Sequence, residues 1–309
     1  MAQKDITQKK LEDYADVFAD IFNVLLIQCP ENDITPDKLF PGPTESIYKA
    51  DDVNREQRRD TYKYYGLENY GAGLHLAALG IENQVTIDPS MPVRIFNYDA
   101  SGFMQQIRQY GDKLTKVNKI VKLIYPVITL VLNFSDYEWK TNTSLYDIME
   151  VPRNLEKLVQ NYHIYVFDIA YLEDEIIDKF TSDFKVVARF FKDKRLGRPM
   201  DDTVSITHIE EVAELFSVFT GQEEYKEVAP NMIYRQKEGE NITMCKFTQE
   251  LLAKGKEQGL EQGKKDTIYQ LVAQSALDID TACSFLDFTK LELKENMEAA
   301  GYDFPLATY

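Results

Sequence analysis

The sequence has few cysteines, no long apolar run and fewer basic than acidic residues. Its three cysteines, Cys29, Cys245 and Cys283, lie far apart and lack the CxxC spacing of zinc and redox sites, so we expect a reducing, cytoplasmic compartment. The most apolar stretch, residues 124–134, is too short to cross a bilayer, and the first ten residues lack the apolar segment of a signal peptide. We therefore expect a protein that is neither exported nor membrane-bound.

Basic residues are outnumbered by acidic ones, 35 to 51, which gives a net charge of −16. This balance works against non-specific attraction to nucleic acid or to an anionic membrane, although it leaves room for a local basic surface. With 309 residues, of which 44% are hydrophobic, the chain can bury a full core as one large domain or two smaller ones.

The first part of the chain alternates helical and strand patterns. Apolar residues at helical spacing predict a first helix over residues 5–27. The segments that follow show either strand-like or helical patterns, and turn residues separate them. They predict strands at 45–50, 59–65 and 74–84, a helix near 90–110, and strands at 124–134 and 163–170. This order indicates an α/β domain over residues 1–195, with residues 45–84 forming a β-meander and 124–134 a buried central strand.

The rest of the chain is predicted to be helical. Helices are expected at 173–180, 182–195 and 205–221, the last ending at Gly221 as a C-cap. We assign residues 196–245 to a helical segment and linker, and residues 246–309 to a helical tail. Two short helices in that tail begin after Asp280 and Thr289, which are candidate N-caps.

Three glycines recur at four-residue spacing in this tail. Gly255, Gly259 and Gly263 share one face of a helix, and each weakens the helix by about 1 kcal/mol relative to alanine. The pattern therefore favours close packing against another helix, and we expect self-association or contact with a partner protein through the C-terminal helices. The alternative is a loosely helical, solvated linker.

Polar residues end the predicted strand at 74–84. Glu82 and Gln84 leave the same face of that strand and Asn83 the opposite face, while Asp60 lies in the preceding strand. Side chains on neighbouring strands approach to about 5 Å, and two carboxylates at that distance repel unless a cation joins them. Magnesium suits such oxygen donors. The alternative is a polar strand end with unrelated surface acids.

The segments that carry these residues resemble a known family. "IENQVTIDPSMPVRIFNYD" at 81–99 and "DDVNREQRRDTYKYY" at 51–65 are similar to the Rpn family of recombination-promoting nucleases and transposases, a branch of the PD-(D/E)XK nuclease superfamily. In that family a Glu-x-Gln on the third strand is followed by Asp, Met and Arg leading into a helix. The resemblance implies the restriction-endonuclease-like fold, a mixed central sheet flanked by helices, followed here by a helical C-terminal extension.

The resemblance also assigns roles to residues. It implies that Asp60 and Glu82 are ligands of Mg²⁺ or Mn²⁺ and that Gln84 replaces the lysine of the superfamily motif. An amide cannot supply the positive charge of a lysine, so a second metal or a nearby basic residue is required. Candidates for that charge are Arg58, Arg59, Lys63 and Arg94.

Two further roles concern the helices that flank the motif. An acid on the first helix often completes such sites, and we place Asp16 ahead of Asp20 for this role, although both lie opposite the apolar face of the predicted helix. For Asp88 we expect that it caps the following helix or holds Arg94.

The expected partner is DNA, which requires basic surface. Two candidate patches are residues 185–198 and a series consisting of Arg108, Lys113, Lys116, Lys119 and Lys122. Runs of lysine are also common on solvated helix faces. The leading hypothesis is a metal-dependent DNA endonuclease linked to recombination or DNA mobility. The alternatives are a catalytically inactive nuclease-fold protein that acts as an interaction module, and a small-ligand or regulatory protein whose C-terminal helices form the main interface.

Overall fold

The chain forms two compact units in the computed structural model, Met1–Phe247 and Thr248–Tyr309. The structure describes residues 2–50, 53–58, 60–67, 74–114, 124–140, 142–198 and 203–305. Among these residues, no helix has the length and apolar character needed to span a membrane.

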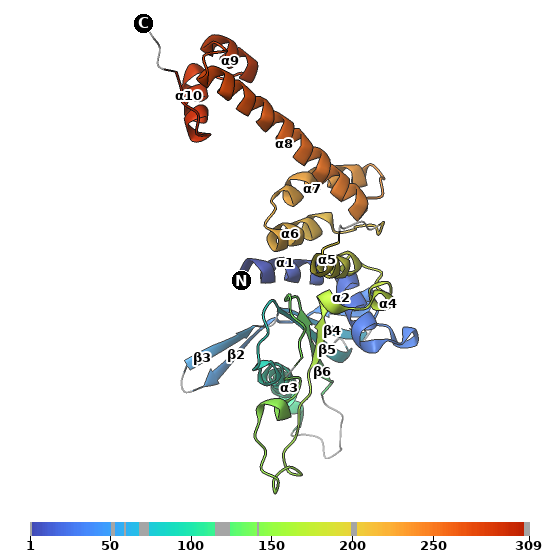
Figure 1. Ribbon diagram of the computed structural model, residues 1–309. Coiled ribbons are helices and arrows are strands. Elements are labelled where there is room, and N and C mark those ends of the chain that lie inside the picture. The colour runs from blue at the N-terminus through green and yellow to red at the C-terminus, as the bar shows by residue number, and fades with distance from the viewer. Residues whose placement is uncertain are drawn as a thin grey trace. The chain divides into compact units, whose positions relative to one another are not determined.

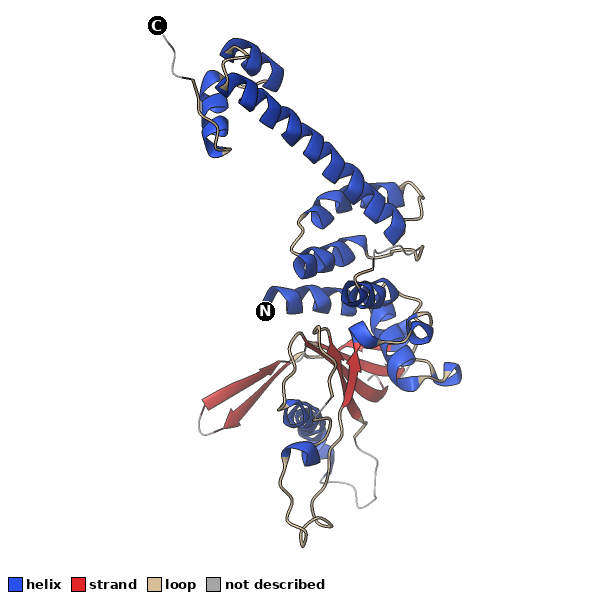
Figure 2. Ribbon diagram, in the orientation of Figure 1, coloured by secondary structure: helices blue, strands red, loops and turns tan. Residues whose placement is uncertain are grey.

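A mixed five-stranded sheet lies at the centre of the first unit (Figures 1 and 2). Its strands, in spatial order, are β1 (Leu39–Pro41), β4 (Thr61–Leu67), β5 (Leu74–Gln84), β6 (Val127–Asn133) and β7 (Tyr165–Asp168). The first two neighbouring pairs, β1 with β4 and β4 with β5, are antiparallel. The other two pairs, β5 with β6 and β6 with β7, are parallel. The expected α/β architecture with a mixed sheet flanked by helices is confirmed at this level.

Apolar residues fix β6 as a buried strand, as its sequence predicts. Every residue of β6 is buried except Ile128, which is half-buried. The neighbouring strand comes close at Gly80, where an added Cβ would lie 2.9 Å from Oγ1 of Thr129. Thr129 in turn donates a hydrogen bond of 2.6 Å to Asp99, so the contact leaves no room for a larger residue at position 80.

Helices cover both faces of this sheet. On one face lie α1 (Ala2–Glu12) and α2 (Ala15–Phe22), which runs on into a π-helical turn over Asn23–Ile27. On the other face α3 (Met91–Leu114) packs Met91, Ile95 and Tyr98 against a cluster of Val131, Trp139 and Ile164. The single helix expected over 5–27 is thus interrupted at residues 13 and 14.

A hairpin leaves the sheet between β1 and β4. Its strands, β2 (Glu45–Ala50) and β3 (Val53–Arg58), form a separate two-stranded sheet. The predicted meander over 45–84 is therefore wrong in its first strand, because the short strand β1 takes the place beside β4. The sequence of the hairpin is mostly polar, which favours an exposed position over burial on the central sheet.

Four helices complete the first unit: α4 (Asp174–Ile177), α5 (Phe184–Leu196), α6 (Ile209–Thr220) and α7 (Glu224–Lys237). Gly221 ends α6 with φ 76°, as expected for a C-cap. The helix α7 lies within residues 196–245, which the sequence predicts as a helical segment and linker. Pro230 lies inside this helix, and an internal proline argues against a helix in the sequence. Contacts between α1 and α6, such as Lys10 Nζ with Glu214 Oε2 at 2.6 Å, group residues 196–245 with the α/β part.

The second unit consists of most of α8 (Met244–Ala273), with α9 (Ile279–Leu286) and α10 (Lys290–Ala299). These helices share a core of Ile268, Tyr269, Val272, Ala282, Leu293 and Met297. Thr289 caps α10 as expected, whereas α9 is capped by Asp278 and not by Asp280. The three glycines of α8 have no heavy atom within 4 Å of an added Cβ, so the predicted close helix packing is not found within the described part of this chain.

Candidate functional site

The sheet brings Asp60 and Glu82 together at the edge where β4 begins and β5 ends. Thr61 pairs with Ile81 in the antiparallel register, so the next position along the two strands sets Asp60 beside Glu82. Oδ2 of Asp60 accepts a hydrogen bond of 2.6 Å from the backbone N–H of Asn83, which holds the two strand ends together. The structure thus places both predicted metal ligands in one neighbourhood.

A lysine from α1 contacts Asp60. Nζ of Lys9 lies 2.7 Å from Oδ1 of Asp60, and the Asp60 side chain is only 11% exposed. Both oxygens of this carboxylate therefore have donors, one from the backbone of β5 and one from α1. Lys9 gives no signal of this role in the sequence, because helical periodicity in the first helix carries no information about Asp60, 51 residues further along the chain.

Glu82 is buried between the sheet and α3. Its Oε1 accepts from Nη2 of Arg94 and, at 3.2 Å, from Nε2 of Gln84. Glu82 is 3% exposed overall, so the ion pair with Arg94 stands in place of water around this carboxylate. Gln84 lies on the same face as Glu82, as expected from the alternation along the strand, and Asn83 points to the opposite face, where it contacts Glu12.

Asp88 holds Arg94, one of the two roles expected for it, but it makes a turn before α3 and does not cap an N–H of the helix. Its Oδ1 accepts from the backbone N–H of Ser90 at 2.9 Å just before α3, and its Oδ2 accepts from Nη1 of Arg94 at 2.9 Å. Burial acts to raise the pKa of Asp88, but the hydrogen bonds from Ser90 and Arg94 outweigh it and lower the pKa. Burial likewise opposes the charge on Arg94, yet Glu82, Tyr98 and Asp88 raise its pKa, so the guanidinium stays charged.

The acid that α1 contributes near Asp60 is Glu12. Its Oε2 accepts hydrogen bonds from Nδ2 of Asn83 at 2.8 Å and from Oγ1 of Thr61 at 3.4 Å. Burial is the main reason why the pKa of Glu12 rises to about 8, and the charge of Asp60 adds to the rise. Glu12 is therefore mostly protonated at neutral pH. In the sequence, Glu12 is marked only by its position next to Leu11, which belongs to the apolar face of the predicted first helix.

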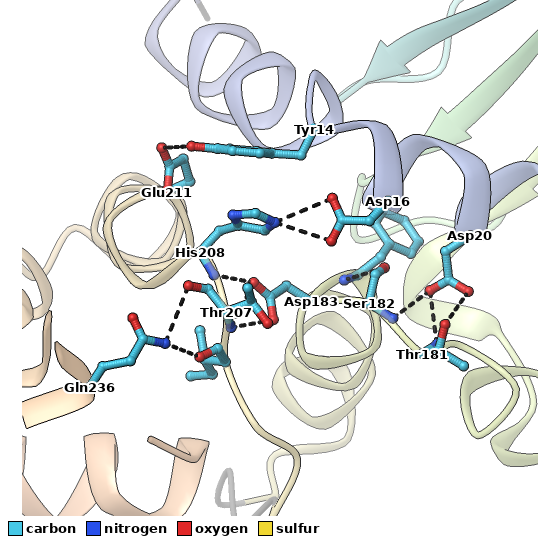
Figure 3. Close-up of polar contacts among 12 residues, drawn as sticks. Tyr14, Asp16, Asp20, Thr181, Ser182, Asp183, Thr207, His208, Glu211 and Gln236 are labelled. Carbon is cyan, nitrogen blue, oxygen red and sulfur yellow. Dashed lines mark hydrogen bonds and ion pairs between the residues drawn. The ribbon is translucent and has the colours of Figure 1, made fainter. Parts of the chain in front are cut away.

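Asp16, the predicted acid of the first helix, faces a different part of the molecule (Figure 3). Its Oδ2 lies 3.2 Å from Nε2 of His208, whose ring stacks on Tyr14 at 3.7 Å between centroids. Asp20 accepts from the backbone N–H groups of Thr181 and Ser182. Both acids thus join α2 to the helical half of the unit, because the break after Glu12 turns α2 away from the strand ends.

Asp60 and Glu82 offer carboxylate oxygens, which are the kind of donor that magnesium takes. Mg²⁺ is commonly held by one or two carboxylates together with waters and substrate phosphates, and Asp60 and Glu82 provide such a pair. Within the described residues, no group of three or more His, Cys, Asp or Glu side chains is arranged to hold a metal ion. A divalent ion at this pair of carboxylates would have to compete with Lys9 for Asp60 and with Arg94 for Glu82.

The other predicted basic residues are placed in part. Lys63 is buried and binds Asp13 through Nζ. In the patch at 185–198, Lys185, Arg189 and Lys192 form ion pairs with Asp174 or Asp178, which reduces the basic character of that surface. Arg108 is exposed on α3. Four of the predicted basic residues lie outside the described residues: Arg59, Lys116, Lys119 and Lys122. The side chains of Arg58 and Lys113 also lie outside them.

The chain was compared with protein families, curated proteins and solved structures. No protein-family model, no curated protein and no solved structure matches the chain.

Proposed function

We propose that this protein is a DNA endonuclease that hydrolyses phosphodiester bonds with Mg²⁺ or Mn²⁺ held by Asp60 and Glu82, and that it acts in recombination or DNA mobility in the cytoplasm. The observation that carries the proposal is the meeting of these two carboxylates on neighbouring strand ends, joined by the hydrogen bond from Asn83 to Asp60. A DNA substrate also agrees with the resemblance of residues 51–65 and 81–99 to the Rpn nucleases.

The reaction adds water across a P–O bond. The water oxygen bonds to phosphorus, one sugar oxygen leaves, and the two protons of water end on solvent and on that sugar oxygen. A bound divalent ion activates water and offsets the negative charge on the phosphate. Gln84 donates from its amide N–H to the carboxylate of Glu82, while Arg94, which Asp88 holds in turn, contacts that carboxylate from the side of α3.

Conservative substitutions at the two carboxylates test the proposal. Asp60→Asn keeps an acceptor for the N–H of Asn83, and Glu82→Gln keeps the shape of that side chain, but each removes the charge that binds the metal. We expect each to lower plasmid cleavage in Mg²⁺ or Mn²⁺ by roughly 100-fold or more. Gln84→Lys should retain cleavage. Glu175→Gln, an exposed glutamate on α4, is the matched control and should cleave as wild type does.

Folding must be checked in the same samples. Trp139 is the single tryptophan and is buried in the first unit, so its fluorescence reports whether each variant keeps its core. Wild type that cleaves no DNA in either metal, or a folded Glu82→Gln that cleaves as fast as wild type, would sink the nuclease assignment.

One observation favours a second candidate function. Lys9 and Arg94 already neutralise Asp60 and Glu82, and the lysine of the superfamily motif is missing at position 84. A protein of this kind that has lost catalysis would act as an interaction module. This second function predicts that the protein binds a partner without metal and cleaves no DNA. The same plasmid assay therefore separates the two functions.

A further inference from the structure

The proposed nuclease lacks a lysine at position 84, so another cation must reach the phosphate. Among the described residues, Lys9 contacts Asp60, Arg94 contacts Glu82, and Lys63 of β4 contacts Asp13. Lys63 is buried, whereas the side chains of Lys9 and Arg94 are exposed to a similar extent, 35% and 37%. Lys9 and Arg94 differ in what holds them and in whether they line a cavity.

Lys63 and Arg94 are held by the protein itself. Nζ of Lys63 donates to the backbone oxygen of Asp13 at 2.7 Å and to its Oδ1 at 2.8 Å, and the Lys63 side chain is only 5% exposed. Arg94 is fixed between Glu82 and Asp88. Moving either cation to a ligand would leave a buried contact unmade, which is unfavourable.

Lys9 differs because it reaches a cavity. Its side chain is 35% exposed and, with Asp60 and Thr61, it lines a cavity of about 500 Å³ beside the strand ends. A lysine carries a compact charge on a flexible stem, so its Nζ can change partner without moving the backbone. Lys10 lines the same cavity but is bound to Glu214 at 2.6 Å.

Resting on the proposed nuclease function, we infer that Lys9 contacts the scissile phosphate in this cavity and supplies the positive charge that Gln84 does not. In the free protein Lys9 neutralises Asp60. With a divalent ion held by Asp60, Lys9 would be released from that carboxylate to contact an oxygen of the phosphate. The helix α1 thereby replaces the strand β5 as the source of the cation.

The acids of the cavity make this assignment specific. Asp13 and Glu211 also line it and repel an anion, so a phosphate can enter only where a cation offsets them. Glu211 accepts from the hydroxyl of Tyr14 at 2.7 Å and lies on α6. The position of Lys9 next to Asp60 defines the end of the cavity at which a phosphate is favoured.

Two neighbouring lysines of one helix provide the test. Lys9→Gln is compared with Lys10→Gln, which removes the same charge from the same cavity away from Asp60. Duplex DNA binding is measured in Ca²⁺ by fluorescence anisotropy over a range of salt concentrations, Mn²⁺ binding without DNA by calorimetry, and cleavage in Mg²⁺ under single-turnover conditions.

We expect Lys9→Gln to cleave roughly 100-fold more slowly than wild type. The slope of log affinity for DNA against log salt concentration should fall by about one, because one phosphate contact is lost. The variant should bind Mn²⁺ at least as tightly as wild type. Lys10→Gln should stay within about 3-fold of wild type in cleavage. The double variant Lys9→Gln/Gln84→Lys should regain cleavage, because it returns the lysine to β5. A residue that merely supports the fold would give no such rescue.

The outcomes separate this inference from the proposed function. If wild type cleaves and Lys9→Gln matches Lys10→Gln in both cleavage and DNA binding, the role of Lys9 is refuted and the nuclease remains. If wild type does not cleave but Lys9→Gln alone weakens DNA binding, the phosphate contact stands and the nuclease assignment fails. Wild type that neither binds nor cleaves DNA refutes both.

Discussion

Replacing Glu12 by glutamine should change how the stability of the first unit depends on pH. Burial raises the pKa of Glu12 from its ordinary value of 4.5 to about 8, so the folded state keeps a proton that the unfolded state has released. Between these two values the folded protein binds more protons, and its stability falls as the pH rises from 4.5 to 8. Above pH 8 the whole penalty is present.

The size of the penalty follows from the same two values. The gap between 4.5 and about 8, at roughly 1.36 kcal/mol for each pH unit, sets an upper value of about 5 kcal/mol. Glu12 is 2% exposed, so solvent screening reduces this figure little. Glu12→Gln removes the ionisable group and retains an oxygen that accepts from Asn83, so the variant should lose this component of the pH dependence.

Urea unfolding followed by Trp139 fluorescence from pH 5 to 9 measures the effect. The difference in unfolding free energy between Glu12→Gln and wild type should grow by a few kcal/mol in favour of the variant as the pH rises. Burial also raises the pKa of Asp183, but that group is present in both proteins and cancels in the difference. Glu175→Gln should follow wild type throughout. Parallel curves for Glu12→Gln and wild type would show that Glu12 ionises normally.

Two further predictions concern glycines. Gly221→Ala should lower the unfolding free energy of the first unit by about 1 kcal/mol, seen as a lower urea midpoint, because Gly221 holds φ 76° at the end of α6; an unchanged midpoint would contradict this. Replacing Gly255, Gly259 and Gly263 together by alanine should stabilise the helix α8 by roughly 1 kcal/mol for each residue. The same triple variant should have the solution mass of a monomer, because the added methyl groups prevent the close approach of a second helix. Sedimentation measures that mass, and an oligomer that survives the triple substitution would remove the glycine face from the account.

Local patterns in the sequence were sufficient for the strands and helices around the motif. The apolar run at 74–84 predicts β5 at its observed bounds, and the acid, amide and apolar residues after it lead into α3 as expected. The contact of Asp88 with Arg94 spans only six residues, so spacing alone suggests it. These features depend on interactions between neighbours in the chain.

The parts that sequence reasoning missed depend on distant partners. Glu12 and Lys9 gain their roles from Asn83 and Asp60, which lie 71 and 51 residues away, and no helical pattern records such a contact. Asp16 looks equivalent to Glu12 within a single helix, and only the interruption at residues 13 and 14 separates them. The polar hairpin between β1 and β4 likewise has strand propensity whichever sheet it joins.

The long-range contacts of α1 have a consequence for the order in which the protein is assembled. Asp60 and Asn83 are synthesised early, but Lys10 meets Glu214 across 204 residues of chain. At about 5–20 residues per second, the ribosome needs roughly 10–40 s to make that stretch. In the later part of that interval, after Asn83 has been made, α1 has its strand partners but lacks its contacts with α6, because α6 does not yet exist. The acids and lysines of the candidate site therefore reach their final surroundings only when two thirds of the chain has been made.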